Sequence, residues 1–145
     1  MQVFKSRSLS VREIQLMSER NELDLTPEFQ RRDVWSDKAR SFLIDTIIRG
    51  KPIPKIYIRS VDNPDTKKIR YEVVDGQQRL TTVLSFLSDG FAIKKIHNSD
   101  FGGKYFSQLM ESIQKDILYY EFTCDYLLDA PDHLTPPQLL DQIVS

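Results

Sequence analysis

A cluster of polar side chains stands where the apolar pattern of the chain changes its period. Residues 69–74 are rich in strand formers, and residues 80–87 carry apolar side chains at helical spacing. The segment Asp75-Gly-Gln-Gln-Arg79 lies between them. A helix N-terminus binds anions through its free N–H groups and its dipole, and an arginine fork matches phosphate oxygens. The sequence therefore predicts a phosphate-binding turn over residues 75–79.

Each residue of this turn has a predicted role. The backbone would cradle phosphate oxygens, while Arg79 would neutralise phosphate charge. Asp75 would hold a divalent ion, orient a water or fix the turn. Asp75 and Arg79 are therefore the candidate catalytic residues, and Asp75 is the candidate metal ligand. The predicted phosphate-binding residues of this stretch are Gly76, Gln77, Gln78, Arg79 and Thr81.

The same residues also allow an ordinary strand–helix turn. In that interpretation Asp75 caps the helix, and Gln77, Gln78 and Arg79 are solvated. The stretch is not a P-loop, because the pattern G-x-x-x-x-G-K-[ST] does not occur in the sequence. Two amides beside an arginine favour a ligand site, but local physics keeps both interpretations open.

A second polar element precedes the first long helix. Residues 27–35 combine a proline, aromatic side chains, an amide and two arginines without regular periodicity. Such a loop can offer stacking faces and donors to a base or a phosphate. Trp35 is expected to pack on the helix that follows.

Two motifs in this order resemble one known family. Asp75-Gly-Gln-Gln-Arg-Leu-Thr-Thr82 is similar to the signature of the DUF262 family, the N-terminal domain of GmrSD-type, modification-dependent restriction proteins. Pro27-Glu-Phe-Gln-Arg-Arg-Asp-Val-Trp35 resembles its P-x-F-Q-R-x-x-V-W element, and Phe101–Leu109 resembles a weaker segment. The resemblance maps Gln30 and Arg31 onto the polar part of that element, which makes them candidate ligand-binding residues, and we expect them to face the same cleft as residues 75–79. The resemblance implies a ParB/sulfiredoxin-like fold, in which loops at the equivalent turn bind nucleotide phosphates.

The resemblance also implies a function. We expect an NTP-binding and NTP-hydrolysing domain of a DNA-restriction or phage-defence system, with a nucleoside triphosphate and Mg²⁺ as cofactors. Expected partners are a nucleotide, modified DNA, and a nuclease domain or partner subunit. The family's F-x-R-x-N-x-x-G segment is not found after Phe122, which also leaves poor nucleotide binding, or the absence of hydrolysis, open. The alternative is a DNA-sensing or assembly module without catalysis of its own.

Length and composition limit the possibilities further. The 145 residues are enough for a single domain, residues 1–145, but not for an added nuclease. Because His97 and His133 stand alone, no HNH-like pattern is present, and we expect an N-terminal fragment or a truncated member. The lone Cys124 excludes an internal disulfide and reads as a core residue. Without a signal stretch or a bilayer-spanning segment, a cytoplasmic protein with no membrane partner is expected.

The positive and negative charges nearly balance over the whole chain, but they are unevenly distributed between its first and last parts. The net charge is −1, which argues against a strongly basic nucleic-acid binder. Residues 1–100 contain 18 Lys and Arg and 14 Asp and Glu. Residues 101–145 contain 2 Lys and Arg and 7 Asp and Glu. The mildly basic first part can meet a phosphate ligand or a DNA backbone, although ordinary surface charge accounts for it as well.

Periodicity and capping signals predict an α/β (α+β) domain, with a small mixed sheet flanked by helices. The capping box of Ser10 and Glu13 begins the first helix, and Ser36 caps the second, whose apolar stripe includes Phe42. Expected helices cover residues 10–20, 37–49, 77–88 and 107–115, with a short one from Thr135-Pro136. Expected strands cover residues 55–59, 69–74 and 118–124, the first two as a hairpin, with a short extended piece at residues 23–25.

Overall fold

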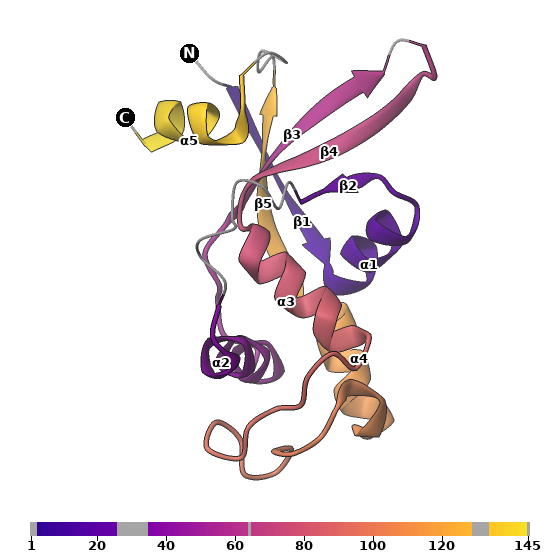
Figure 1. Ribbon diagram of the computed structural model, residues 1–145, viewed down its shortest axis with the longest axis vertical. Helices are drawn as coiled ribbons and strands as arrows, with labels where there is room; N and C mark the ends of the chain where they lie inside the picture. Colours follow the sequence, from indigo (N-terminus) through magenta and orange to yellow (C-terminus); the bar gives the residue numbers. More distant parts are fainter. Residues whose placement is uncertain (1–2, 26–34, 64, 129–133, 145) are drawn as a thin grey trace.

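The computed structural model describes residues 3–25, 35–63, 65–128 and 134–144. Within these ranges five strands form one mixed sheet in the order β1-β5-β3-β4-β2, which confirms the predicted α/β class (Figure 1). The strands are β1 (Val3–Ser10), β2 (Leu23–Asp24), β3 (Ile56–Asn63), β4 (Lys68–Asp75) and β5 (Glu121–Leu128). The helices are α1 (Val11–Glu19), α2 (Asp37–Ile48), α3 (Gln77–Leu87), α4 (Glu111–Tyr119) and α5 (Pro136–Val144), with a 3₁₀ turn η2 (Phe106–Gln108).

The predicted hairpin of β3 and β4 forms the centre of this sheet. These two strands pair antiparallel, with a register shift between Tyr57 and Ile58. β5 runs parallel to β3 and antiparallel to the edge strand β1. β2 pairs with β4 in parallel over two residues, where Leu23 stands opposite Tyr71.

The two faces of the sheet are covered by different helices. Ile58 and Val73 belong to the main core, to which α1, α2, α3 and α4 contribute buried side chains. The neighbouring residues Val74 and Leu127 point the other way and pack with Leu139 of α5. Side chains of a strand alternate between faces, so β4 presents successive valines to two separate clusters. Figure 1 shows α5 lying apart from the other four helices.

Local capping accounts for where the helices begin. The Ser10 hydroxyl accepts from the Glu13 N–H at 3.0 Å, and the Glu13 carboxylate accepts from the Ser10 N–H at 3.2 Å. The Ser36 hydroxyl accepts from the Ala39 N–H at 3.2 Å. Each contact satisfies an N–H that the helix itself leaves free. These contacts confirm the predicted starts of α1 and α2. α5 begins at Pro136, which confirms the start predicted from Thr135-Pro136.

Four details differ from the sequence-based expectations. β1 was not expected, because its residues are mostly polar and its pairing with β5 is long-range. The helix expected over residues 107–115 begins later, since η2 covers residues 106–108 and α4 starts only after Met110. Because α4 continues to Tyr119, the strand expected over residues 118–124 begins only at Glu121. Phe42 was placed on the apolar stripe of α2, yet its side chain is 60% exposed.

Cys124 lies in the core, as expected. It is fully buried in the main cluster, and burial is the largest cause that raises its pKa to about 12. The thiol therefore stays protonated at neutral pH, which makes it a poor nucleophile. In the described part of the chain no helix has the length and apolarity needed to cross a bilayer.

A buried ion pair lies on the sheet face that α5 covers. The Arg59 side chain is 3% exposed, and its Nη2 pairs with the Glu72 carboxylate on the neighbouring strand. Its Nη1 donates to the Leu134 carbonyl at 2.5 Å, just before α5. Arg59 therefore links the central hairpin to the C-terminal segment.

We predict that Arg59→Ala lowers the free energy of unfolding by about 3–5 kcal/mol, because it leaves the Glu72 carboxylate buried without its partner. The double variant Arg59→Met, Glu72→Gln is expected to lose much less, since no charge is then left unpaired. The control is Lys115→Ala, which removes an exposed pair with Glu111 and should cost about 0–1 kcal/mol. Urea unfolding measures all three, and equal losses in Arg59→Ala and Lys115→Ala would contradict the prediction.

Candidate functional site

The predicted turn joins β4 to α3 through a glycine in a left-handed conformation. Gly76 is the N-cap residue of α3, with φ of 108° and ψ of 12°. A Cβ added there would lie 2.4 Å from Cδ1 of Ile56, the first residue of β3, and 3.3 Å from Nη2 of Arg79. Ile56 is fully buried. The turn therefore needs glycine for two reasons, its backbone angle and the close approach of β3.

The Gln77 side chain points into the fold. It is 4% exposed, and its Nε2 donates to the carbonyls of Val73 at 2.8 Å and Val74 at 3.3 Å. Gln77 can therefore offer a ligand its backbone N–H rather than its amide group. This geometry corrects the alternative in which Asp75 caps the helix and Gln77 is solvated, because Gly76 is the N-cap and Gln77 is buried.

Arg79 is also not solvated, and its guanidinium reaches back to the start of β3. Nη2 donates to the Lys55 carbonyl at 2.8 Å and lies 3.9 Å from Oδ2 of Asp75. The Arg79 side chain is 16% exposed, whereas that of Asp75 is 42% exposed. In the described part of the chain, the buried Nε of Arg79 has no hydrogen-bond partner. Burial lowers the pKa of Arg79, and the Asp75 carboxylate partly opposes that shift.

These features make the turn suited to an anion. The first N–H groups of α3 have no intrahelical acceptor, and no side chain caps them. Arg79 occupies the third helical position, so its charge lies in the same turn as these donors. A guanidinium has five N–H donors, of which the Lys55 carbonyl takes one. A partly desolvated cation attracts an anion more strongly than a fully hydrated one does.

The remaining predicted residues are less closely placed. Gln78 is half-buried in the first turn of α3, and Thr81 is exposed one turn further along. Gln30 and Arg31 lie outside the described residues, so their expected place at this cleft stays a prediction. The described residues contain no group of three or more His, Cys, Asp or Glu that could hold a metal ion. The role of Asp75 as a metal ligand therefore also stays a prediction.

Lys55 belongs to the site but was missed by the sequence reasoning. Besides accepting from Arg79 through its carbonyl, it places Nζ 3.3 Å from Oδ2 of Asp125 on β5. Asp125 also accepts a hydrogen bond of 2.6 Å from the Ser6 hydroxyl. Pro52 and Pro54 signal an extended chain here, but no local pattern indicates which carbonyl Arg79 will reach.

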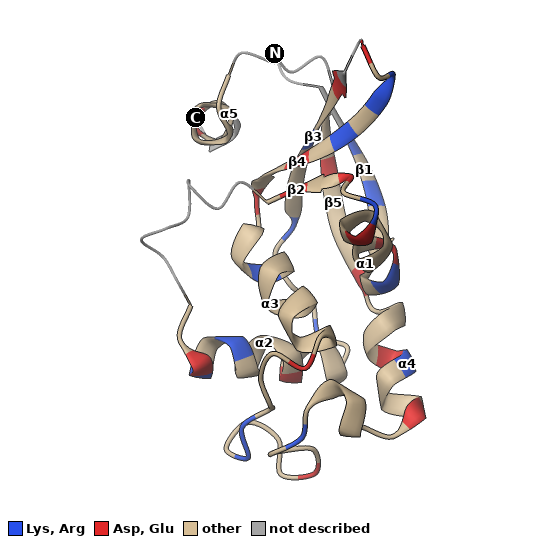
Figure 2. Cartoon of the chain, turned by 45° about the vertical axis from the view of Figure 1, so that its right-hand side comes forward, with Lys and Arg blue, Asp and Glu red and all other residues tan. Residues whose placement is uncertain are grey.

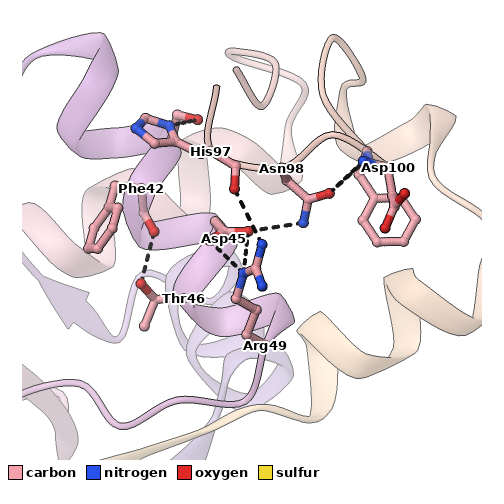
Figure 3. A network of polar contacts seen from close by, with 9 residues as sticks. Phe42, Asp45, Thr46, Arg49, His97, Asn98 and Asp100 are labelled. Carbon is pink, nitrogen blue, oxygen red and sulfur yellow. Dashed lines mark hydrogen bonds and ion pairs between the residues drawn. The ribbon is translucent and has the colours of Figure 1, made fainter. Parts of the chain in front are cut away.

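A second polar network, also missed, fixes a loop against α2 (Figure 3). Asp45 is 7% exposed and accepts from Nε of Arg49 at 2.9 and 3.0 Å and from Nδ2 of Asn98 at 2.9 Å. Oδ1 of Asn98 in turn accepts from the N–H groups of Asp100 and Phe101 at 3.0 and 2.9 Å. This network shapes residues 98–101 into a turn and ties it to the helix.

His97 takes part in the same attachment. Its Nδ1 lies 2.8 Å from the fully buried Ser41 hydroxyl, which also accepts from the Lys94 N–H at 2.8 Å. The His97 ring meets the Phe42 ring edge-on, with centroids 5.8 Å apart. We therefore interpret His97 as a structural residue, which agrees with its isolation in the sequence.

Comparison with known proteins identifies one family. A protein-family model described as GmrSD restriction endonuclease, N-terminal domain, matches residues 13–138. This range contains the whole turn at residues 75–79, together with Lys55 and Ile56. No curated protein and no solved structure gives a significant match to the chain.

We predict that Gly76→Ala destabilises the domain more than Gly50→Ala does. Both glycines have positive φ, but a Cβ at Gly50 meets nothing within 4 Å, so that variant bears only the backbone cost of about 1–2 kcal/mol. At Gly76 the overlap with Ile56 should add about 1–3 kcal/mol. Ile56→Val, which removes Cδ1, should recover part of the added loss in the double variant. Urea unfolding tests this, and strict additivity of the two changes would contradict it.

We also predict that Asn98→Ala loosens the loop without unfolding the domain. The variant removes one of the hydrogen bonds to Asp45, which keeps Arg49, and leaves the N–H groups of Asp100 and Phe101 without their acceptor, so we expect a loss of about 1–3 kcal/mol. Amide hydrogen exchange over residues 94–104 should accelerate while that of α3 stays the same. Ser99→Ala, at the exposed neighbouring position, is the control. Unchanged exchange over the loop in Asn98→Ala would show that the network does not hold it.

Proposed function

The chain belongs to the family of GmrSD restriction endonuclease N-terminal domains, and from this membership and the geometry of the turn we propose that it binds a nucleoside triphosphate at residues 75–79. Membership makes the protein a component of a DNA restriction or phage-defence system. The observation that carries the finer proposal is the Arg79 guanidinium, which is partly buried, gives only one of its donors to the Lys55 carbonyl and stands at an uncapped helix N-terminus.

In this proposal the phosphates lie across the first turn of α3. The N–H groups of Gln77 and Gln78 donate to phosphate oxygens, and Arg79 supplies the positive charge. Mg²⁺ commonly uses one or two carboxylates plus phosphate oxygens and water, and Asp75 is exposed enough to serve as one of them. Thr81, Gln30 and Arg31 are further proposed contacts.

Hydrolysis is a finer step of the same proposal. Asp75 would accept a proton from the water that attacks the terminal phosphorus, while the bond from that phosphorus to the bridging oxygen breaks and the nucleoside diphosphate leaves. Arg79 would stabilise the charge that develops on the phosphate. Modified DNA and a nuclease, either in the same protein or as a partner subunit, are the proposed partners. They follow from the family, whose members are restriction endonucleases.

The binding proposal is tested by thermal shift on the wild type and Arg79→Met. Inorganic tripolyphosphate and the four ribonucleoside triphosphates, each with and without Mg²⁺, are the probes. A ligand at 100 times its Kd should add about 2.7 kcal/mol to the stability of the wild type. Arg79→Met keeps the side-chain stem but removes the charge, so it should lose this shift. It should also lose about 1 kcal/mol of stability with the Lys55 hydrogen bond.

Arg40→Met is the matched control. Arg40 also bonds α3, but at its other end, through Ser85 at 2.9 Å, so this variant should keep the ligand shift. A shift that persists in Arg79→Met would place the ligand elsewhere. If no probe shifts the wild type, the DNA-sensing or assembly alternative gains support. Binding to modified and plain DNA at two salt concentrations then tests it, since phosphate contacts weaken steeply with salt.

A further inference from the structure

A groove separate from the turn at residues 75–79 opens beside α1, on the sheet face that α1, α2, α3 and α4 cover. It encloses about 210 Å³. Its aromatic side chains are Tyr71 of β4 and Tyr126 of β5, and its aliphatic ones include Leu16 and Met17 of α1. We call it the tyrosine groove. Neither the turn at residues 75–79 nor the network around Asp45 contributes a residue to it.

The aromatic rings of the groove present flat and edge surfaces together. The rings of Tyr71 and Tyr126 stand nearly perpendicular, at 83°, with centroids 6.1 Å apart. The exposed Arg7 holds its guanidinium carbon 5.4 Å from the Tyr126 centroid. Arg7 therefore covers the ring in the way that a planar cation stacks on an aromatic face. The Tyr126 side chain is mostly buried, and burial raises its pKa to about 12, so its hydroxyl remains a neutral donor and acceptor.

The charges around the groove exclude two kinds of ligand. Arg7 and Arg20 are balanced by Glu13 and Glu22, and Figure 2 shows the alternation of both signs around α1. Two carboxylates would repel a polyphosphate, unlike the cationic turn at Arg79. A purely aliphatic ligand would offer no partner to the charged and polar groups that line the groove. The groove suits a neutral, planar molecule with both donors and acceptors on its edge.

The volume of the groove limits the class of ligand further. Sites for drug-sized ligands usually measure about 300–1,000 Å³, so a groove of about 210 Å³ fits a single ring system better than a whole nucleoside triphosphate. Nucleobases combine flat faces, which stack on aromatic rings and on arginine, with edges that carry donors and acceptors.

We propose that the tyrosine groove binds a purine or pyrimidine base. The base stacks against the tyrosine rings, the exposed Arg7 moves onto its outer face, and Arg20 and Glu22 bond its edge. The base can come from a free nucleoside or from a nucleotide turned out of a DNA strand. Because this site shares no residue with the turn at 75–79, it stands independently of the nucleotide-binding proposal.

The test is an NMR titration of protein labelled with ¹³C in its tyrosine rings and with ¹⁵N in its backbone amides. Adenosine, guanosine, cytidine and uridine, which lack phosphate, form one arm, and a twelve-nucleotide single-stranded DNA of mixed sequence forms the other. We expect saturable movement of the Tyr71 and Tyr126 signals, which Tyr71→Leu and Tyr126→Phe assign. Inorganic tripolyphosphate should leave these signals in place and move only backbone signals of the turn, so the two proposals fail or succeed separately.

Matched variants sharpen the test. Arg7→Ala and Tyr71→Leu should each weaken binding at least about tenfold, the scale of one lost stacking contact. Lys5→Ala, on the same strand, and Tyr119→Leu, at an exposed tyrosine outside the groove, should bind like the wild type. Movement with nucleosides supports a free base as the ligand, and movement with DNA alone supports an extruded one. If neither arm moves the two signals, or if Arg7→Ala binds unchanged, the proposal is wrong.

Discussion

The site geometry depends on the contact between Gly76 and Ile56. The first residue of β3 occupies the space that a side chain on the turn would need, so the turn can only be built around glycine. The same approach brings the Lys55 carbonyl within 2.8 Å of Arg79. The end of β4, the start of β3 and the first turn of α3 are thereby held as one unit. An anion at this place meets donors that are already positioned, and little ordering free energy is lost on binding.

The turn is also tied to both faces of the sheet. Gln77 bonds the carbonyls of Val73 and Val74, whose side chains belong to the main core and to the α5 cluster respectively. A displacement of the first turn of α3 would therefore strain the packing on both faces, because close-packed interiors do not deform freely. The buried pair of Arg59 and Glu72 adds polar links on the α5 face. These links make the turn a rigid part of the fold rather than a surface loop.

The sequence was sufficient to predict the features that depend on residues close together in the chain. The capping residues Ser10 and Ser36, the turn between β3 and β4 and the glycine at position 76 all act within a few residues, and each was found. Long-range contacts were missed: the pairing of β1 with β5, the inward turn of Gln77 and the bond from Asn98 to Asp45. A glutamine after a strand reads the same whether its amide meets water or two carbonyls, since only the tertiary fold decides which acceptors are near.

Electrostatics distinguishes the turn at residues 75–79 from the tyrosine groove. At the turn a positive charge is partly withdrawn from water, and the nearest carboxylate, that of Asp75, stands 3.9 Å away, too far for a hydrogen bond. At the tyrosine groove two arginines face two glutamates, so the local field nearly cancels and ring surfaces dominate. Charge therefore favours phosphate at the turn and disfavours it at the tyrosine groove. The aromatic surface, in contrast, favours a flat ring in the groove. Under the two proposals, a nucleotide at the turn and a base in the groove would be recognised by different chemistry and could act as separate signals.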